Sequence, residues 1–219
     1  MTEITDYITM DLKAIDSQDT IESVLDFFDD LIFSHFPVVE NGTYIGNIAF
    51  EDIETFDIDK KVIDYKYTLE HFFATTDMIW MDVLEIFAKN NTNLVPVLDE
   101  KNNYIGYYEI EDVIKILHET PFFNESGGII IIKKATLDYS MSQITQIVET
   151  NNAKLLGLFV SDKNIESVQI TIKISTGPMN EIIQTFRRYN YEIISEHKED
   201  NYINTLKERS DYLNKFLNM

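Results

Sequence analysis

The apolar positions of the first 120 residues follow a helical period and then a strand period, and this order occurs twice. Between Ile21 and Ile32, apolar side chains recur at i, i+3, i+4 and i+7 spacing, which predicts a helix with one buried face. Residues 36–39 and 44–48 are short β-rich runs around an Asn-Gly dipeptide, which is typical of a tight hairpin. A short extended segment is expected near 14–17, and a second helix near the acidic pair at 51–52.

The second copy has a helix at 79–90, strands at 94–98 and 104–108, and a helix at 110–118. Matched positions are Val24 and Val83, Pro37 and Pro96, and Gly46 and Gly106. The offset is 59 for the first two pairs and 60 for the third, so one residue is inserted in the turn between the two strands. An offset that changes once, inside a turn, indicates a duplicated fold unit.

The second half has a different order of elements. Strands are predicted at 129–135, 154–161, 167–174 and 191–196, with helices at 141–150 and 178–190. Apolar and polar residues alternate in the third of these strands, which predicts one face in contact with water. This βαββαβ order is that of a ferredoxin-like domain. The fold class is therefore α/β (α+β), with a final amphipathic helix at about 203–217.

These patterns divide the chain into five segments. They are 1–62 (first copy), 63–121 (second copy), 122–128 (linker), 129–200 (ferredoxin-like domain) and 201–219 (C-terminal helix).

The net charge of −20 lies entirely on the duplicated half. Up to Glu125 there are 27 acidic residues, seven lysines and no arginine, and the rest of the chain is neutral. Binding to nucleic acid requires a basic surface, so this function is disfavoured. The longest apolar runs are too short to span a bilayer, no secretory signal is apparent, and cysteine is absent. We therefore expect a cytoplasmic protein without a membrane partner.

The order of elements in each copy, with a Pro-Val strand, an apolar strand containing Gly and an Asp six residues later, resembles the CBS domain, which occurs in tandem as a Bateman module. The resemblance implies a disc of two units related by a pseudo-two-fold axis. Clefts between such units often bind AMP, ATP or S-adenosylmethionine. In the family signature Gly-x-x-Thr/Ser-x-x-Asp, the hydroxyl and a helix N-terminus hold phosphate, and the Asp accepts hydrogen bonds from ribose.

Both copies depart from this signature at the phosphate position. Asp52 and Asp112 are retained, but the hydroxyl residue is Ala49 in one copy and Glu109 in the other. A carboxylate at a phosphate position repels the ligand. Phosphate-free adenosine, S-adenosylmethionine, a cation-bridged nucleotide or no ligand are therefore favoured over free AMP or ATP, and both Asp residues are also plausible helix caps. The ligand-binding residues implied by the resemblance are Asp52, Asp112, Ala49, Glu109, His35, Pro37, Val38, Pro96, Val97, Gly46 and Gly106.

A ferredoxin-like domain after a CBS pair resembles an ACT or ACT-like domain, and the whole succession is similar to the acetoin-utilisation regulatory family, AcuB. The resemblance implies an amino-acid site near Asp138 and Ser140. However, the segment 134–140 has no glycine for backbone capture of a carboxylate, so these residues are alternatively N-caps. Gly157 is expected to mark a bulge or a close backbone approach.

The sequence thus predicts a non-enzymatic regulatory protein that acts as a homodimer and responds to an adenosine-type ligand. A regulated protein partner is a second expected interaction. The alternative is an assembly scaffold whose ligand sites have degenerated. Catalytic residues are not predicted, because no nucleophile and base or phosphate loop is apparent. A metal site is not predicted either, because the histidines are scattered at 35, 71, 118 and 197.

Overall fold

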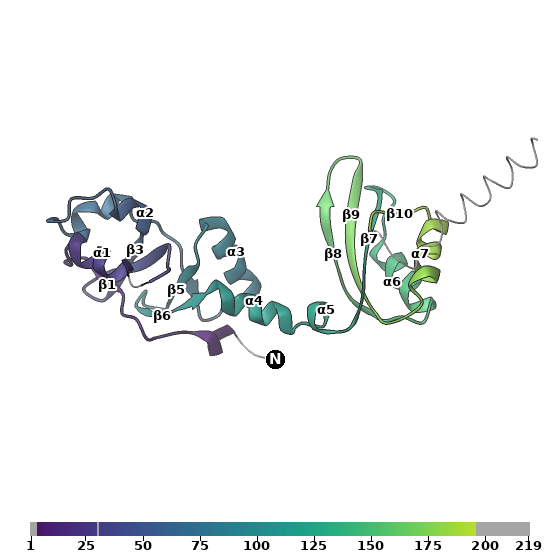
Figure 1. Cartoon of the computed structure of the whole chain (residues 1–219), viewed down its shortest axis with the longest axis horizontal. Helices are drawn as coiled ribbons and strands as arrows, with labels where there is room; N and C mark the ends of the chain where they lie inside the picture. The colour runs from purple at the N-terminus through teal and green to yellow at the C-terminus, as the bar shows by residue number, and fades with distance from the viewer. Residues whose placement is uncertain (1–3, 30, 196–219) are drawn as a thin grey trace, which may run out of the picture. The chain divides into compact units, whose positions relative to one another are not determined.

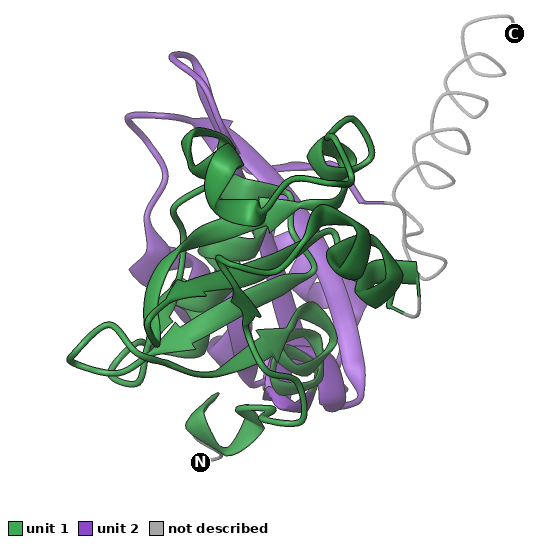
Figure 2. Ribbon diagram, turned by 90° about the vertical axis from the view of Figure 1, so that its left-hand side faces the viewer, with its two compact units in different colours: residues 1–118 green, residues 119–219 purple. Residues whose placement is uncertain are grey.

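The computed structural model describes residues 4–29 and 31–195 (Figure 1). It divides into two compact units, residues 1–118 and 119–219, which Figure 2 colours separately. The helix predicted at 203–217 lies outside the described residues.

Unit 1 contains the two copies, each with a three-stranded sheet in which a parallel pair is followed by an antiparallel pair. Copy 1 consists of β1 (Ile15–Asp16), α1 (Ile21–Asp29), β2 (His35–Glu40), β3 (Thr43–Ala49) and α2 (Phe50–Ile53). Copy 2 consists of β4 (Ala74–Thr75), α3 (Trp80–Asn90), β5 (Leu94–Leu98), β6 (Tyr104–Glu109) and α4 (Ile110–Glu119). Short 3-10 helices, Ile4–Tyr7 and Val62–Thr68, precede the two copies.

The Asn-Gly hairpin is confirmed. Asn41 and Gly42 both have positive φ, of 52° and 83°, as a two-residue turn of this kind requires. Glu40 consequently faces Thr43 across the β2–β3 ladder. The extent predicted for the first helix is wrong at its C-terminal end, because α1 spans Ile21–Asp29 and the side chain of Ile32 is 83% exposed.

The segment that leads into each copy pairs with the sheet of the other copy. Thr9 forms two backbone hydrogen bonds with Tyr107 of β6, each 2.9 Å long. Glu70 forms the equivalent two bonds with Asn47 of β3, at 2.7 and 2.9 Å. Tyr107 and Asn47 occupy matched positions 60 residues apart, so the exchange is reciprocal. The two copies are therefore joined by backbone pairing in addition to side-chain packing.

The two matched glycines permit this exchange. Gly46 and Gly106 have φ of 142° and 152°, a region that residues with a Cβ rarely adopt. A Cβ atom on Gly46 would lie 2.7 Å from the Leu69 Cβ, and one on Gly106 would lie 2.5 Å from the Thr9 carbonyl oxygen. Each glycine thus leaves room for the segment that arrives from the other copy.

Unit 2 has the predicted βαββαβ order. Its elements are β7 (Gly127–Ala135), α6 (Met141–Thr150), β8 (Leu155–Lys163), β9 (Ser167–Ser175), α7 (Met179–Arg188) and β10 (Glu192–Ile193), preceded by α5 (Pro121–Asn124). The sheet order is β10-β7-β9-β8, which is the ferredoxin-like order, and α6 and α7 lie on one face of the sheet (Figure 1). Where a linker was predicted at 122–128, the structure has most of α5 and the start of β7.

The core of unit 2 lies between the helices and the sheet. It contains alternate residues of β7 and β9 together with the inward faces of α6 and α7. The predicted close approach at Gly157 is confirmed, because a Cβ there would lie 2.7 Å from the Phe122 ring and the β8–β9 register shifts between Leu155 and Gly157.

We predict that Gly106→Ala destabilises unit 1 by about 3 kcal/mol, because backbone strain adds to the clash with Thr9. Gly42→Ala is the control, since Gly42 also has positive φ but has no atom within 4 Å of a Cβ. Its expected cost is about 1 kcal/mol. Urea unfolding followed by fluorescence of Trp80, the single tryptophan, reports on unit 1. Equal losses in the two variants would contradict the packing role of Gly106.

Candidate functional site

Ser34 and Asn93 form reciprocal hydrogen bonds at the junction of the two copies. They precede β2 and β5 and occupy matched positions 59 residues apart. The Ser34 backbone N–H donates to Asn93 Oδ1 at 2.9 Å, and the Asn93 backbone N–H donates to Ser34 Oγ at 3.3 Å. Asn93 Nδ2 also donates to the Ile32 carbonyl at 2.7 Å. This pair therefore marks the pseudo-two-fold axis that the repeat implies.

The same two residues fix the start of a helix in each copy. The Phe50 N–H at the start of α2 donates to the Ser34 carbonyl at 2.9 Å, and the Ile110 N–H at the start of α4 donates to the Asn93 carbonyl at 3.2 Å. In each copy, the residue at the pseudo-two-fold axis is thus hydrogen-bonded to the start of the helix that follows the second strand of the hairpin.

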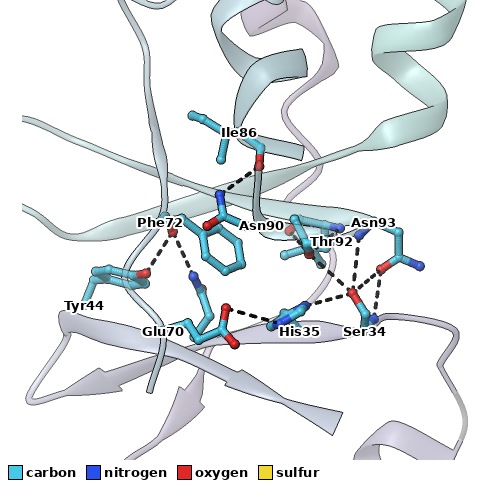
Figure 3. Close-up of polar contacts among 11 residues, drawn as sticks. Ser34, His35, Tyr44, Glu70, Phe72, Ile86, Asn90, Thr92 and Asn93 are labelled. Atoms are coloured by element: carbon cyan, nitrogen blue, oxygen red, sulfur yellow. Dashed lines mark hydrogen bonds and ion pairs between the residues drawn. The ribbon is translucent and has the colours of Figure 1, made fainter. Parts of the chain in front are cut away.

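The copy 1 junction contains His35, which is buried and faces Ala49 across the β2–β3 ladder. Figure 3 shows its ring between Ser34 and Glu70. His35 Nδ1 is 2.9 Å from Ser34 Oγ, and Nε2 is 3.6 Å from Glu70 Oε2. The ring of Phe72 packs against the imidazole edge to face, with centroids 5.4 Å apart. Both Glu70 and Phe72 belong to the segment that leads into copy 2.

The Phe72 carbonyl accepts two hydrogen bonds from β3 of copy 1 (Figure 3). One comes from the Tyr44 hydroxyl at 2.9 Å, and the other from Asn47 Nδ2 at 2.8 Å. Asn47 Oδ1 is fully buried and has no hydrogen-bond partner among the described residues. The leading segment of copy 2 is therefore held by backbone and side chains of copy 1.

The copy 2 junction is more acidic. Leu94 stands where copy 1 has His35, and Glu109 stands where copy 1 has Ala49. The Tyr107 hydroxyl donates to Asp11 Oδ1 at 2.8 Å. Burial raises the pKa of the Glu109 carboxyl, and the negative charges of Asp112 and Glu111 raise it further. This junction therefore opposes a further negative charge.

The two signature aspartates differ in whether their carboxylate has a partner. Asp112 Oδ1 is 2.9 Å from Lys115 Nζ, one turn further along α4. Asp52, in α2, is half-buried, and its carboxylate has no partner among the described residues. Of the two signature aspartates, only Asp112 therefore has a side-chain partner among the described residues.

The remaining residues named for the site are part of the sheets. Pro37, Val38, Pro96 and Val97 are buried, and both valines belong to hydrophobic cores. Gly46 and Gly106 contact the exchanged segments, as described above. The structure brings His35 and Ala49 together, as a cross-strand pair.

Two surface cavities flank the exchanged segments. One, of about 390 Å³, lies between residues 10–14 and the β5–β6 hairpin and is lined in part by Gly106, Tyr104 and Lys13. The other, of about 400 Å³, lies between residues 71–73 and the outer side of α3.

In unit 2, Ser140 is the N-cap of α6, and its Oγ accepts from the Gln143 N–H at 3.4 Å. Asp138 lies in the preceding turn and is exposed. The capping role suggested for Ser140 is confirmed, whereas an amino-acid site at these residues stays a prediction.

Across residues 4–29 and 31–195, no three His, Asp or Glu side chains are grouped so that they could hold a metal ion. None of the described helices has the length and apolar character needed to cross a bilayer.

Sequence reasoning missed Ser34, Asn93, Glu70 and Asn47. Ser34 and Asn93 share the repeat offset of 59, so alignment of the two copies could have identified them. Glu70 had no such signal, because the exchange depends on how the leading segment crosses between sheets.

Comparison with known families now identifies the first half of the chain. Residues 4–57 and 67–119 each match the CBS domain. Unit 1 is therefore a tandem CBS domain pair.

Among known proteins, the chain is 28% identical over 153 residues to the uncharacterized protein MJ0188 of Methanocaldococcus jannaschii. The match covers 69% of this chain and 57% of that relative. A solved CBS domain pair/ACT domain protein from Thermotoga maritima is 22% identical, with a TM-score of 0.49, and the match covers 54% of this chain and 98% of that one. The cytosolic domain of the Mg²⁺ channel MgtE in complex with ATP is 22% identical, with a TM-score of 0.46, over 52% of this chain and 48% of that one.

We predict that Glu109→Gln raises the melting temperature of unit 1 at pH 7. The folded state raises the pKa of Glu109 above its ordinary value of 4.5, so it favours the protonated form, and the ionised carboxylate destabilises the fold. This cost is absent below pH 4.5 and appears as the pH rises through the folded-state pKa. The gain in the variant should therefore shrink toward zero as the pH falls below 4.5. Glu100→Gln, in an exposed turn, is the control. A gain that is the same at pH 4 and pH 7 would contradict the electrostatic origin.

Proposed function

We propose that the chain is a non-enzymatic regulatory protein whose CBS pair binds an adenosine-type ligand at the copy 1 junction. The observation that carries the proposal is the difference between the two signature aspartates. Asp52 has a free carboxylate, whereas Asp112 is paired with Lys115. A free carboxylate can accept hydrogen bonds from both hydroxyls of a ribose.

Charge also favours copy 1. Ala49 leaves the phosphate position without a carboxylate, and the nearby imidazole of His35 is already oriented by Ser34. In copy 2, Glu109 places a carboxylate at the equivalent position and repels phosphate. We therefore propose one site per chain for an adenosine-type ligand. The candidates are adenosine, S-adenosylmethionine, AMP and ATP, the last with a bridging cation.

The exchange of leading segments provides a structural connection by which ligand binding at copy 1 could affect copy 2. Glu70 and Phe72 belong to copy 2 but contact His35, Tyr44 and Asn47 of copy 1. A ligand at the copy 1 junction would favour one arrangement of both copies, and the two-state equilibrium would shift by the difference in affinity for the two states. We propose that a homodimer or a protein partner responds to this shift.

We further propose that unit 2 is an ACT-like regulatory domain, so that the chain resembles AcuB proteins in domain order. This rests on the sheet order β10-β7-β9-β8 and on its place after a CBS pair. The second candidate function is an assembly scaffold, favoured by the loss of both signature hydroxyls at Ala49 and Glu109.

Calorimetric titration of the full chain with adenosine, AMP, S-adenosylmethionine and ATP, with and without magnesium, tests the proposal. We expect one site per chain, and Asp52→Asn should weaken binding about 10- to 100-fold, because it removes the negative charge and one of the two acceptor oxygens. Asp112→Asn should weaken binding less, since Asp112 is already paired. Asp59→Asn, at an exposed position, is the control for altered net charge.

Absence of binding by all of these compounds at millimolar concentration would favour the scaffold. Binding that depends on Asp112 rather than Asp52 would place the site in copy 2 and contradict the assignment to copy 1.

A further inference from the structure

One face of the unit 2 sheet lies opposite α6 and α7, and within the described part of the chain the four-residue α5 is the helix that contacts it. Alternate residues of β7 and β9 pack against α6 and α7, so the intervening residues point to the opposite face. On that face Ile129 is 44% exposed and Phe159 is 49% exposed. It is therefore a partly apolar surface rather than the polar surface that strand alternation predicted.

Lys173 lies on this face near the C-terminal end of β9, an inner strand of the sheet, and is only 8% exposed. Its neighbours across the ladders are Ile129 of β7 and Gly157 of β8. The described residues provide neither an ion pair nor a hydrogen bond to its amine. Because β9 has a strand on each side, the aliphatic part of the side chain is covered, which leaves one positive charge within an apolar region.

The surroundings of Lys173 are shaped by Gly157. This residue has no side chain, and the ring of Phe122 from α5 lies over it. Phe122 also contacts Phe159, with ring centroids 5.6 Å apart. Aromatic and aliphatic carbon thus borders the lysine on the side of β8 as well as that of β7.

Two acidic residues that lie within the ladders of this face are at other positions. Glu192 of β10 is opposite Lys133, and Asp162 of β8 is opposite Gln169. Neither is a cross-strand neighbour of Lys173. At Lys173 the two cross-strand neighbours therefore leave one cation for an anionic group, and neither neighbour is a carboxylate that could pair with an ammonium group.

We infer that this face binds a small amphiphilic carboxylate, whose acid group pairs with Lys173 and whose apolar body lies on Ile129, Phe159 and Phe122. A charge-assisted hydrogen bond to the partly desolvated amine fixes the acid, and burial of the hydrocarbon supplies the rest of the affinity. Neither cross-strand neighbour of Lys173 is a carboxylate, which disfavours free amino acids at this position, because their ammonium group would lose hydration without a partner there.

Octanoate is the probe, tested on the full chain by calorimetry and by NMR of the amides of β7–β9. We expect binding at millimolar concentration, whereas octylammonium and leucine should not bind. Lys173→Met keeps the length and apolar character of the side chain and should weaken octanoate binding at least ten-fold. Lys133→Met, on the same face but opposite Gln169, should bind octanoate as the native chain does.

A second variant keeps the test decisive if Lys173→Met fails to fold. Ile129→Glu replaces a partly exposed residue and places a carboxylate across the ladder from Lys173, so it should abolish octanoate binding while the domain stays folded.

Equal octanoate affinity in the native chain and Lys173→Met would overturn the inference. So would equal binding of octanoate and octylammonium, which would indicate an unspecific apolar surface. If octanoate does not bind and Lys173→Met instead alters the molecular mass in solution, the face is an interface between two copies of the chain, and the ligand assignment is wrong.

Discussion

The structure of unit 1 depends on the reciprocal backbone pairing of the two leading segments, Thr9 with Tyr107 and Glu70 with Asn47. Each copy alone has a sheet of three strands, one of them only two residues long. Such a small sheet buries little apolar surface without a further layer. Because the segment that leads into each copy pairs with the sheet of the other copy, neither copy is complete by itself.

The two similar copies nevertheless carry two unlike junctions. The axis at Ser34 and Asn93 fixes matched backbone geometry in both, while the side chains around it have diverged. Copy 1 has His35, Ala49 and a free Asp52. Copy 2 has an acidic cluster in which Glu109 has a raised pKa and Asp112 is already paired with Lys115. The proposed single ligand site follows from this divergence, because like charges oppose an anionic ligand in copy 2.

Most of the element positions of unit 1 could be predicted from the sequence, because the repeat and the Asn-Gly turn fix strand and hairpin boundaries within one or two residues. In unit 2 the strand predicted at 191–196 is too long, because β10 spans only Glu192–Ile193. β5 and α6 have the predicted bounds. Three features could not be predicted. The end of α1 was misplaced because Ile32 continues the helical period of apolar residues, and the crossing of the leading segments leaves no periodic signal. The burial of Lys173 could not be predicted either, because its cross-strand neighbours Ile129 and Gly157 come from β7 and β8 and leave no signal in the alternation of β9.

Native-state hydrogen exchange of the two bridging pairs tests the central claim most directly. If the exchanged segments unite the copies, the amides of Thr9, Tyr107, Asn47 and Glu70 should open with the same free energy as the cores of both copies, in one cooperative step. Opening of one copy and its bridging amides at a clearly lower free energy, while the other copy stays protected, would contradict the account.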